Sequence, residues 1–126
     1  MMKIKKIVAG VLATATLASG ALCVGASAAT RSYPARITLN GTSATLYNES
    51  GTTRYCTCDF YVYSRTTGNK LGEDHKGDVR ASGGSLTATK TGYASVTNYY
   101  HEGYGAIYNG TYSWSGIYIS VSDDDL

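Results

Sequence analysis

The sequence predicts an all-β protein: a small antiparallel β-sandwich (or barrel) of about 6–8 strands, preceded by a helical signal peptide. Three observations support this prediction. The chain has 12 tyrosines and many threonines, which favour strands. Apolar and polar residues alternate with a period of two in several short runs. Turns rich in glycine and asparagine separate these runs, and residues typical of long helices are scarce after residue 29.

The first 29 residues have the layout of an export signal. Three lysines form a positively charged start: Lys3, Lys5 and Lys6. An uncharged apolar run follows over residues 7–21, and small residues then lead to residue 29. This order is what signal peptidase recognises. We therefore expect a secreted, extracellular protein.

Cleavage is expected after Ala28 or Ala29, because both positions have small residues at −1 and −3. The mature chain then begins at Ala29 or Thr30; removing residues 1–29 of the 126 leaves 97, which suits one domain. We expect a single β-sandwich domain over residues 30–121 and a solvated acidic tail over 122–126. No second apolar segment is long enough to span a membrane, so no membrane span is expected after cleavage.

The charge balance argues against a nucleic-acid partner. The whole chain has 11 lysines and arginines against 9 aspartates and glutamates, a net charge of +2. The expected cleavage removes three lysines and no acid, which leaves 8 basic residues and a net charge of −1. Nucleic-acid-binding domains normally carry a clustered basic excess. We therefore expect no nucleic-acid binding.

The first hairpin is expected over residues 35–46. Asn40-Gly41 suits a two-residue type I′ turn, because both central residues of that turn need positive φ. Such a turn pairs Leu39 with Thr42 and gives the hairpin one polar and one apolar face. The apolar face contains Ala35, Ile37, Leu39, Ala44 and Leu46.

A long strand is expected over residues 54–65. Its inward positions are Cys56, Cys58, Phe60 and Val62. Its outward positions are Tyr55, Thr57, Asp59, Tyr61 and Tyr63. The two sets are separated because successive side chains of a strand point to opposite faces of a sheet.

Residues 70–84 are charged and glycine-rich, and we expect a long loop there with at most a short strand near Val79. Alternation then predicts strands over residues 86–88 and 94–100.

A second Asn-Gly pair, Asn109-Gly110, predicts a hairpin between residues 106–108 and 111–114. Gly116 is expected to mark a break or bulge, because alternation resumes after it through residues 117–121.

Cys56 and Cys58 lie two residues apart on the predicted inward face. In an extended strand such residues have Cβ atoms roughly 6.6 Å apart, whereas a disulfide needs about 3.8 Å. We expect two buried thiols beside Phe60, with a strained disulfide at a local bulge as the alternative. Zinc would need two further ligands, and the only histidines are His75 and His101. No metal site and no cofactor are expected.

Two groups of titratable residues are candidates for catalysis. Residues 73–78 gather carboxylates around His75, but the spacing is not that of an EF-hand, and an exposed charged loop explains them. His101 and Glu102 lie at the expected end of a strand, with no third residue to orient them. Nucleophile-elbow, zinc-protease and phosphate-loop motifs are absent from the sequence. We therefore expect that the protein is not an enzyme.

The outward tyrosines are the best candidates for binding. Tyr55, Tyr61 and Tyr63 offer large amphipathic rings, and Asp59 between them is placed to orient a sugar hydroxyl or a backbone amide. Further tyrosines are expected to extend this surface: Tyr99, Tyr104 and Tyr108. We expect a secreted, non-catalytic binding domain whose ligand is a glycan, the cell envelope or a protein. The alternative is a face that packs under a second sheet or that serves only strand formation.

The chain also resembles the lactococcin family of Sec-exported, unmodified bacteriocins. The matching pieces are a strand, a turn and a strand with paired tyrosines: Ser43–Tyr47, Thr67-Gly68 and Val96–Tyr100. The chain departs from that family in its Cys56 and Cys58 pair and in the residues beyond Gly105. The resemblance implies a β-sandwich without a cofactor that inhibits the growth of related bacteria at the cell envelope.

Overall fold

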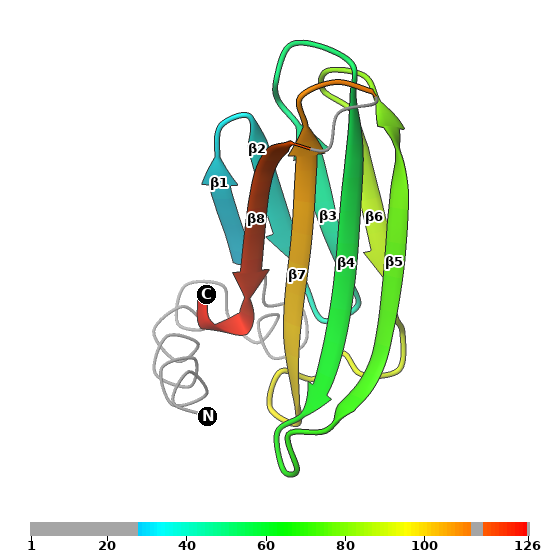
Figure 1. Cartoon of the computed structure of the whole chain (residues 1–126). Helices are drawn as coiled ribbons and strands as arrows, with labels where there is room; N and C mark the ends of the chain where they lie inside the picture. Colours follow the sequence, from blue (N-terminus) through cyan, green and yellow to red (C-terminus); the bar gives the residue numbers. More distant parts are fainter. Residues whose placement is uncertain (1–27, 112–114, 126) are drawn as a thin grey trace.

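The computed structural model describes residues 28–111 and 115–125. Eight strands form two antiparallel four-stranded sheets that pack face to face, which confirms the predicted all-β sandwich (Figure 1). Within these residues, no helix is long and apolar enough to cross a membrane. The expected signal helix and Trp114 lie outside the described residues.

The first sheet has the strand order β1-β2-β3-β6. Its strands are β1 (Ala28–Ser32), β2 (Ala35–Leu39), β3 (Ser43–Asn48) and β6 (Ser85–Thr89). Because β1 and β6 are the edges, each pairs with one neighbour only.

The second sheet has the strand order β5-β4-β7-β8. Its strands are β4 (Arg54–Ser64), β5 (Lys70–Arg80), β7 (Tyr99–Tyr108) and β8 (Gly116–Ser122). A short 3-10 helix, η2 (Asp123–Asp125), follows β8.

The core lies between the two sheets and is built from the alternate residues of their facing sides. The first sheet contributes Ala35, Ile37, Leu39, Ala44, Leu46, Leu86 and Ala88. The second contributes Cys56, Cys58, Phe60, Val62, Ile107, Ile119 and Val121. The inward set predicted for β4 is therefore correct, because each of its four residues is buried.

The β2–β3 hairpin has the predicted faces but a different register. Leu39 pairs with Ala44, not with Thr42, so the connection is two residues longer than predicted. A shift of two residues moves every side chain to an equivalent position on the same face, because side chains alternate with a period of two. The apolar face is preserved for this reason.

The predicted type I′ turn is wrong. The side-chain Oδ1 of Asn40 accepts hydrogen bonds from the backbone N–H groups of Thr42 (2.8 Å) and Ser43 (2.9 Å), an Asx-type arrangement. Gly41 is not among the glycines with positive φ. It is required for close approach instead, because a Cβ there would collide with the backbone of Ala94.

The prediction of a loop over residues 70–84 is wrong for most of these residues, because Lys70–Arg80 form β5. β5 pairs with β4 from Arg80 to Lys70, with one irregularity near Val62. β5 is an edge strand with mostly exposed residues, so it does not need the apolar alternation that identifies half-buried strands. Charged side chains on such an edge also discourage pairing with other chains.

One continuous strand, β7, contains residues 99–100 and 106–108 of the two predicted strands, whereas residues 94–98, which were also predicted to be strand, precede it and are not strand. Gly103 and Gly105 lie on its inward side, facing the first sheet. A Cβ at Gly103 would lie 2.8 Å from the Cβ of Ala44, and one at Gly105 would lie 2.7 Å from the Cδ1 of Leu46. These glycines therefore let the two sheets approach each other rather than ending the strand.

The second hairpin also differs from the prediction. Tyr108 pairs with Gly116, so Asn109 and Gly110 do not form the predicted two-residue turn; residues 112–114 of the predicted strand over 111–114 lie outside the described residues. The backbone N–H of Asn109 donates to the carbonyl oxygen of Ser115 (2.8 Å). Gly116 is the first residue of β8 and not a break within it.

The acidic tail expected to be solvated contains one buried carboxylate. Asp123 is 2% exposed, and its Oδ2 accepts hydrogen bonds from the backbone N–H (2.8 Å) and the Nδ1 (2.9 Å) of His101. Arg65 Nη2 lies 3.6 Å from the same oxygen. Asp123 therefore anchors η2 to β7, and the prediction of a solvated tail is wrong for this residue.

Candidate binding surface

Tyrosines gather on the outward side of the second sheet, opposite the core. We call this surface the tyrosine face; it consists of Tyr55, Tyr61, Tyr63, Tyr100, Tyr104, Tyr108 and Tyr118. Tyr99, which was expected to belong to it, instead packs against Tyr93 and the core, with ring centroids 5.2 Å apart. Tyr118 is an addition that could have been found from the sequence, because it lies between Ile117 and Ile119 of an alternating run.

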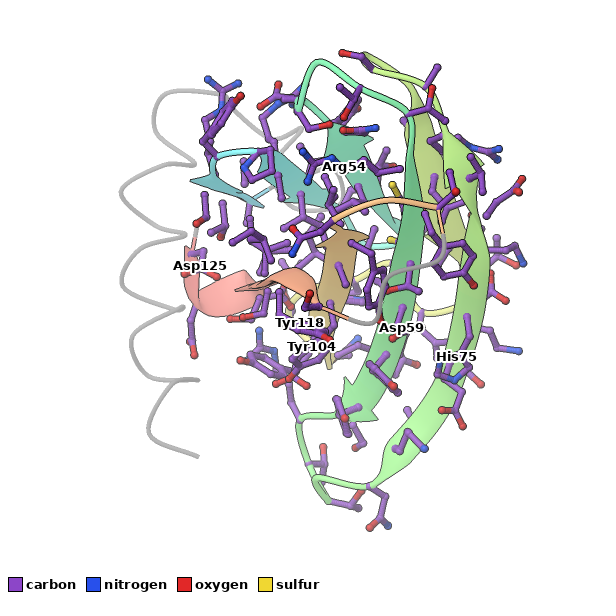
Figure 2. The ribbon with its side chains drawn as sticks, turned by 45° about the horizontal axis from the view of Figure 1, so that its top comes forward. Arg54, Asp59, His75, Tyr104, Tyr118 and Asp125 are labelled. Carbon is purple, nitrogen blue, oxygen red and sulfur yellow. The ribbon has the colours of Figure 1, made fainter. Side chains whose placement is uncertain are left out.

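The strand register brings the predicted residues of β4 beside residues from β5, β7 and β8. Two neighbouring rows cross the sheet from β5 to β8: His75–Asp59–Tyr104–Ser120 and Glu73–Tyr61–Glu102–Ser122. Figure 2 shows His75 beside Asp59, Tyr104 next to Tyr118, and Asp125 of η2 on the far side. The tyrosine face therefore extends across β4, β7 and β8.

The rings of the tyrosine face contact one another at steep angles. Tyr61 and Tyr104 have centroids 5.7 Å apart with planes at 75°, and Tyr108 and Tyr118 have centroids 6.0 Å apart at 85°. Tyr55 lies 5.6 Å from Tyr108 at 45°. The first two of these pairs are edge-to-face, an arrangement that is favourable for aromatic rings. The rings therefore form a ridged surface and not one flat platform.

Solvent reaches the tyrosine face unevenly. Tyr118 is 66% exposed and Tyr104 is 41% exposed, whereas Tyr100 is 2% exposed. The Tyr100 hydroxyl donates to Asp124 Oδ2 (3.2 Å), and burial raises the pKa of this phenol above its usual range. Tyr104 and Tyr118 are thus the rings best placed to contact a ligand, while Tyr100 has a supporting position.

A histidine held between two carboxylates borders the tyrosine face. His75 Nδ1 lies 2.8 Å from Asp59 Oδ1, and His75 Nε2 lies 2.9 Å from Glu73 Oε1. The hydrogen bond to Asp59, followed by that to Glu73, raises the pKa of His75. One oxygen of Asp59 is therefore already engaged by an imidazole within the protein.

Glu102 lies on the other side of the same tyrosines. The Tyr104 hydroxyl donates to Glu102 Oε1 (3.1 Å), and burial, with the nearby Glu102 charge as a smaller cause, raises the pKa of Tyr104 to about 12. Tyr104 therefore stays a hydrogen-bond donor at neutral pH.

A cavity of about 350 Å³ opens beside Tyr104, where β1, β7, β8 and η2 meet. Its polar lining includes Thr30, Glu102, Ser120, Ser122 and Asp125, and no basic residue contributes to it. This cavity could not be predicted from the sequence, because its residues come from three separate segments of the chain.

The two candidate catalytic residues, His101 and Glu102, point to opposite sides of β7. His101 is fully buried, and its Nε2 lies 2.6 Å from the carbonyl oxygen of Tyr93 while its Nδ1 contacts Asp123. Glu102 faces outward with Tyr104. The structure therefore does not bring this pair together. Residues 28–111 and 115–125 hold no group of three or more histidines, cysteines or carboxylates that could bind a metal.

Cys56 and Cys58 are free thiols on the inward side of β4, 1% and 0% exposed. Cys58 Sγ lies 3.3 Å from the carbonyl oxygen of Ala44. Burial raises the pKa of Cys58 to about 11 and also raises that of Cys56. Neither thiol is accessible to a ligand on the tyrosine face.

Neither a protein-family model nor a curated protein matches the sequence. One similar solved structure is described as a beta-glucuronidase from glycoside hydrolase family 2, with 14% sequence identity and a TM-score of 0.34. The similarity covers 79% of this chain and 11% of that chain, so this protein spans about a tenth of the enzyme's length. At these values the likeness says nothing about activity. Fold and surface together define a small β-sandwich domain with one aromatic sheet face.

Proposed function

We propose that this protein is a secreted, non-catalytic binding domain that recognises an extracellular ligand through its tyrosine face. The observation that carries the proposal is the set of tyrosine rings that three strands contribute to one face of the sheet, of which Tyr104 and Tyr118 remain exposed. Burying apolar ring surface releases about 25 cal/mol per Å². Rings that are held in position by their neighbours gain this energy on binding at a small cost in side-chain entropy.

The state of the two histidines supports a role without catalysis. The ring of His101 is enclosed in the core between Asp123 and the carbonyl of Tyr93. The ring of His75 is held at both nitrogens by Asp59 and Glu73. Neither imidazole has a nitrogen directed at an open reaction site, which general acid–base catalysis would need.

The ridged shape of the tyrosine face bears on the ligand. Neighbouring rings at 75° and 85° present alternating faces and edges, so a flat crystalline polymer surface would contact only part of each ring. A soluble glycan, a cell-envelope polymer or a protein has the uneven surface that this arrangement fits. Secretion, which the order of residues in the first 29 positions supports, places the domain among such ligands.

The test compares binding by the secreted protein and by two variants. The Tyr104→Ala/Tyr118→Ala double variant removes the two exposed rings. Tyr33→Ala removes a still more exposed tyrosine (75%) from the connection between β1 and β2, off the tyrosine face. Each protein is applied to a glycan array and to purified bacterial cell-wall sacculi. We expect the wild type and Tyr33→Ala to bind alike and the double variant to bind at least about tenfold more weakly, since central aromatic contacts are commonly worth about 2 kcal/mol.

Equal binding by the folded double variant and the wild type would exclude the tyrosine face. The absence of binding to both probes would exclude glycans and the cell wall as its ligands. The antibacterial function implied by the lactococcin resemblance has a separate readout. Growth inhibition of a related strain that the double variant retains would favour that function over recognition by the tyrosine face.

A further inference from the structure

The outer side of β8 is a free sheet edge without charged side chains. Among the described residues, β8 pairs with β7 only. The other edge of the same sheet, β5, has many charged side chains, which discourage the addition of a further strand. None of the residues Gly116–Ser122 is charged. β8 is therefore the edge of the second sheet that is open to pairing with another strand.

The hydrogen bonds at the two ends of the β7–β8 ladder show which backbone groups of β8 are free. The N–H of Asn109 donates to the carbonyl oxygen of Ser115 (2.8 Å), and the N–H of His101 donates to Asp123 Oδ2 (2.8 Å). Both N–H groups therefore point to the β8 side of β7. Successive residues of an antiparallel strand alternate between bonding across the ladder and pointing away from it. The odd-numbered residues of β8 consequently bond to β7, and the even-numbered ones point outward.

Two residues of β8 have backbone groups directed at the open edge. The N–H of Ser122 confirms the outward direction of the even-numbered residues, because it donates to Asp125 Oδ2 (2.7 Å) and not to β7. No backbone partner for the outward N–H and C=O groups of Tyr118 and Ser120 is found among residues 28–111 and 115–125. Both residues are exposed. The chemical complement of such a row of donors and acceptors is the backbone of another extended strand.

The space beside this edge fits one strand. The cavity beside Tyr104 touches Ser120 of β8 and Thr30 of β1, so it extends along the edge between the two sheets. β8 packs against both β1 and β2 of the opposite sheet, so β1 extends past the edge of β8 (Figure 1). A single added strand would lie beside β8 with one of its sides covered by β1. A second copy of this protein would instead bring its own β1 into the same space.

We propose that β8 binds an extended peptide segment of another protein by strand addition, held by the backbone groups of Tyr118 and Ser120. Alternate side chains of the bound strand would face β1 and Ile117, which is partly buried against the core, so apolar residues fit there. The other side chains would lie on the outward side and reach solvent. This site goes beyond the proposed function, because backbone groups and not tyrosine rings make the recognition.

Amide hydrogen exchange of the purified free protein, followed by NMR, tests the open edge. We expect the N–H groups of Tyr118 and Ser120 to exchange at least about tenfold faster than those of Ile119 and Val121, which bond to β7. Slow exchange at Tyr118 and Ser120 would overturn the proposal. If that slow exchange depends on protein concentration, it identifies a second copy of the chain as the occupant of the edge.

Random heptapeptides displayed on phage are the probe for the bound strand, because β8 itself has seven residues. Peptides selected on the purified protein are synthesised, and their affinity is measured by fluorescence anisotropy. Ser120→Pro removes an outward N–H and no bond to β7, a position at which edge strands tolerate proline. Ser120→Ala is the control, because it removes the hydroxyl and keeps the N–H. We expect Ser120→Ala to bind like the wild type and Ser120→Pro to bind at least about tenfold more weakly.

The absence of selected peptides, or equal binding by Ser120→Pro and the wild type, would overturn the proposal. The selected peptides should also slow the exchange of the Tyr118 and Ser120 N–H groups in the wild type. Unchanged exchange would overturn the proposal even if Ser120→Pro does not fold. Loss of peptide binding by a Ser120→Pro variant that still binds glycans or sacculi would support this site and leave the tyrosine face intact, so the two proposals fail separately.

Discussion

Replacing Asp123 by asparagine should destabilise the fold by about 3–5 kcal/mol, the usual cost of neutralising one partner of a buried ion pair. The carboxylate is 3% exposed at its side chain and accepts two hydrogen bonds from His101, at 2.8 and 2.9 Å. Hydrogen bonds to a charged group contribute about 1.5–3 kcal/mol each, so these two bonds alone give an effect of this size.

The Arg65 cation that is left behind explains why an amide of the same shape cannot replace the carboxylate. Arg65 has a side chain only 10% exposed, and its Nη1 and Nη2 have no hydrogen-bond partner among the described residues. Burial lowers the pKa of Arg65, and the charge of Asp123 is the main effect that opposes this. Asparagine removes that charge and directs an N–H group toward other donors.

The assay is denaturant unfolding of the purified protein, with thermal melting as a second measure. One kcal/mol corresponds to about 4–8 °C for a domain of 60–100 residues, so the melting temperature should fall by about 12 °C or more. Asp78→Asn is the control, because Asp78 pairs with Arg80 on the exposed β5 edge and should contribute at most about 1 kcal/mol. A loss of less than about 1 kcal/mol for Asp123→Asn, equal to that of the control, would refute the role of this cluster.

Three further predictions concern packing, thiol reactivity and pH. Gly103→Ala should cost about 1–3 kcal/mol by overpacking the sheets, whereas Gly110→Ala, with nothing within 4 Å of the added Cβ, should be nearly neutral in denaturant unfolding. The two buried cysteines of β4 should not react with a thiol reagent at pH 8 until the protein unfolds; rapid labelling of the native state would contradict their burial. His75→Gln should flatten the pH dependence of stability above about pH 6.5. The raised pKa of His75 stabilises the fold fully below the pKa of the unfolded state, and this stabilisation is lost as pH rises through the pKa of the folded state. An unchanged pH profile would show that the contacts with Asp59 and Glu73 have no energetic effect.

Alternation predicted the half-buried parts of this fold and failed where a strand is not half-buried. β4 has one inward and one outward set of residues, and the structure places both as expected. β5 is an exposed edge strand, so its charged sequence resembles a loop although its backbone pairs along β4. A strand that pairs with a neighbour but has mostly exposed side chains on both faces shows no alternation of apolar and polar residues.

Turn and glycine patterns predicted the structure less reliably than alternation did, because tertiary contacts decide which conformation such residues adopt. Asn40-Gly41 satisfied the requirements of a type I′ turn, yet the Asn40 side chain forms an Asx-type loop and Gly41 makes room for a distant backbone. Gly103 and Gly105 are inside a strand because the opposite sheet comes too close for a side chain. For each of these glycines the deciding contact is with a residue that is distant in the sequence.

The tyrosine face could be predicted in part. The rings of β4 follow from alternation, whereas their contacts with His75, Tyr104 and Glu102 depend on strand order and register. Strand order and register do not follow from the residues of a single strand.

The most direct test of the central proposal is hydroxyl-radical footprinting of the purified protein with and without cell-wall sacculi, followed by mass spectrometry of the tyrosines. Tyr104 and Tyr118 are the most exposed rings of the tyrosine face, and Tyr33 is an exposed ring outside it. We predict that sacculi protect Tyr104 and Tyr118 from modification and leave Tyr33 unprotected. Unchanged modification of all three tyrosines, or protection of Tyr33 alone, would contradict binding through the tyrosine face.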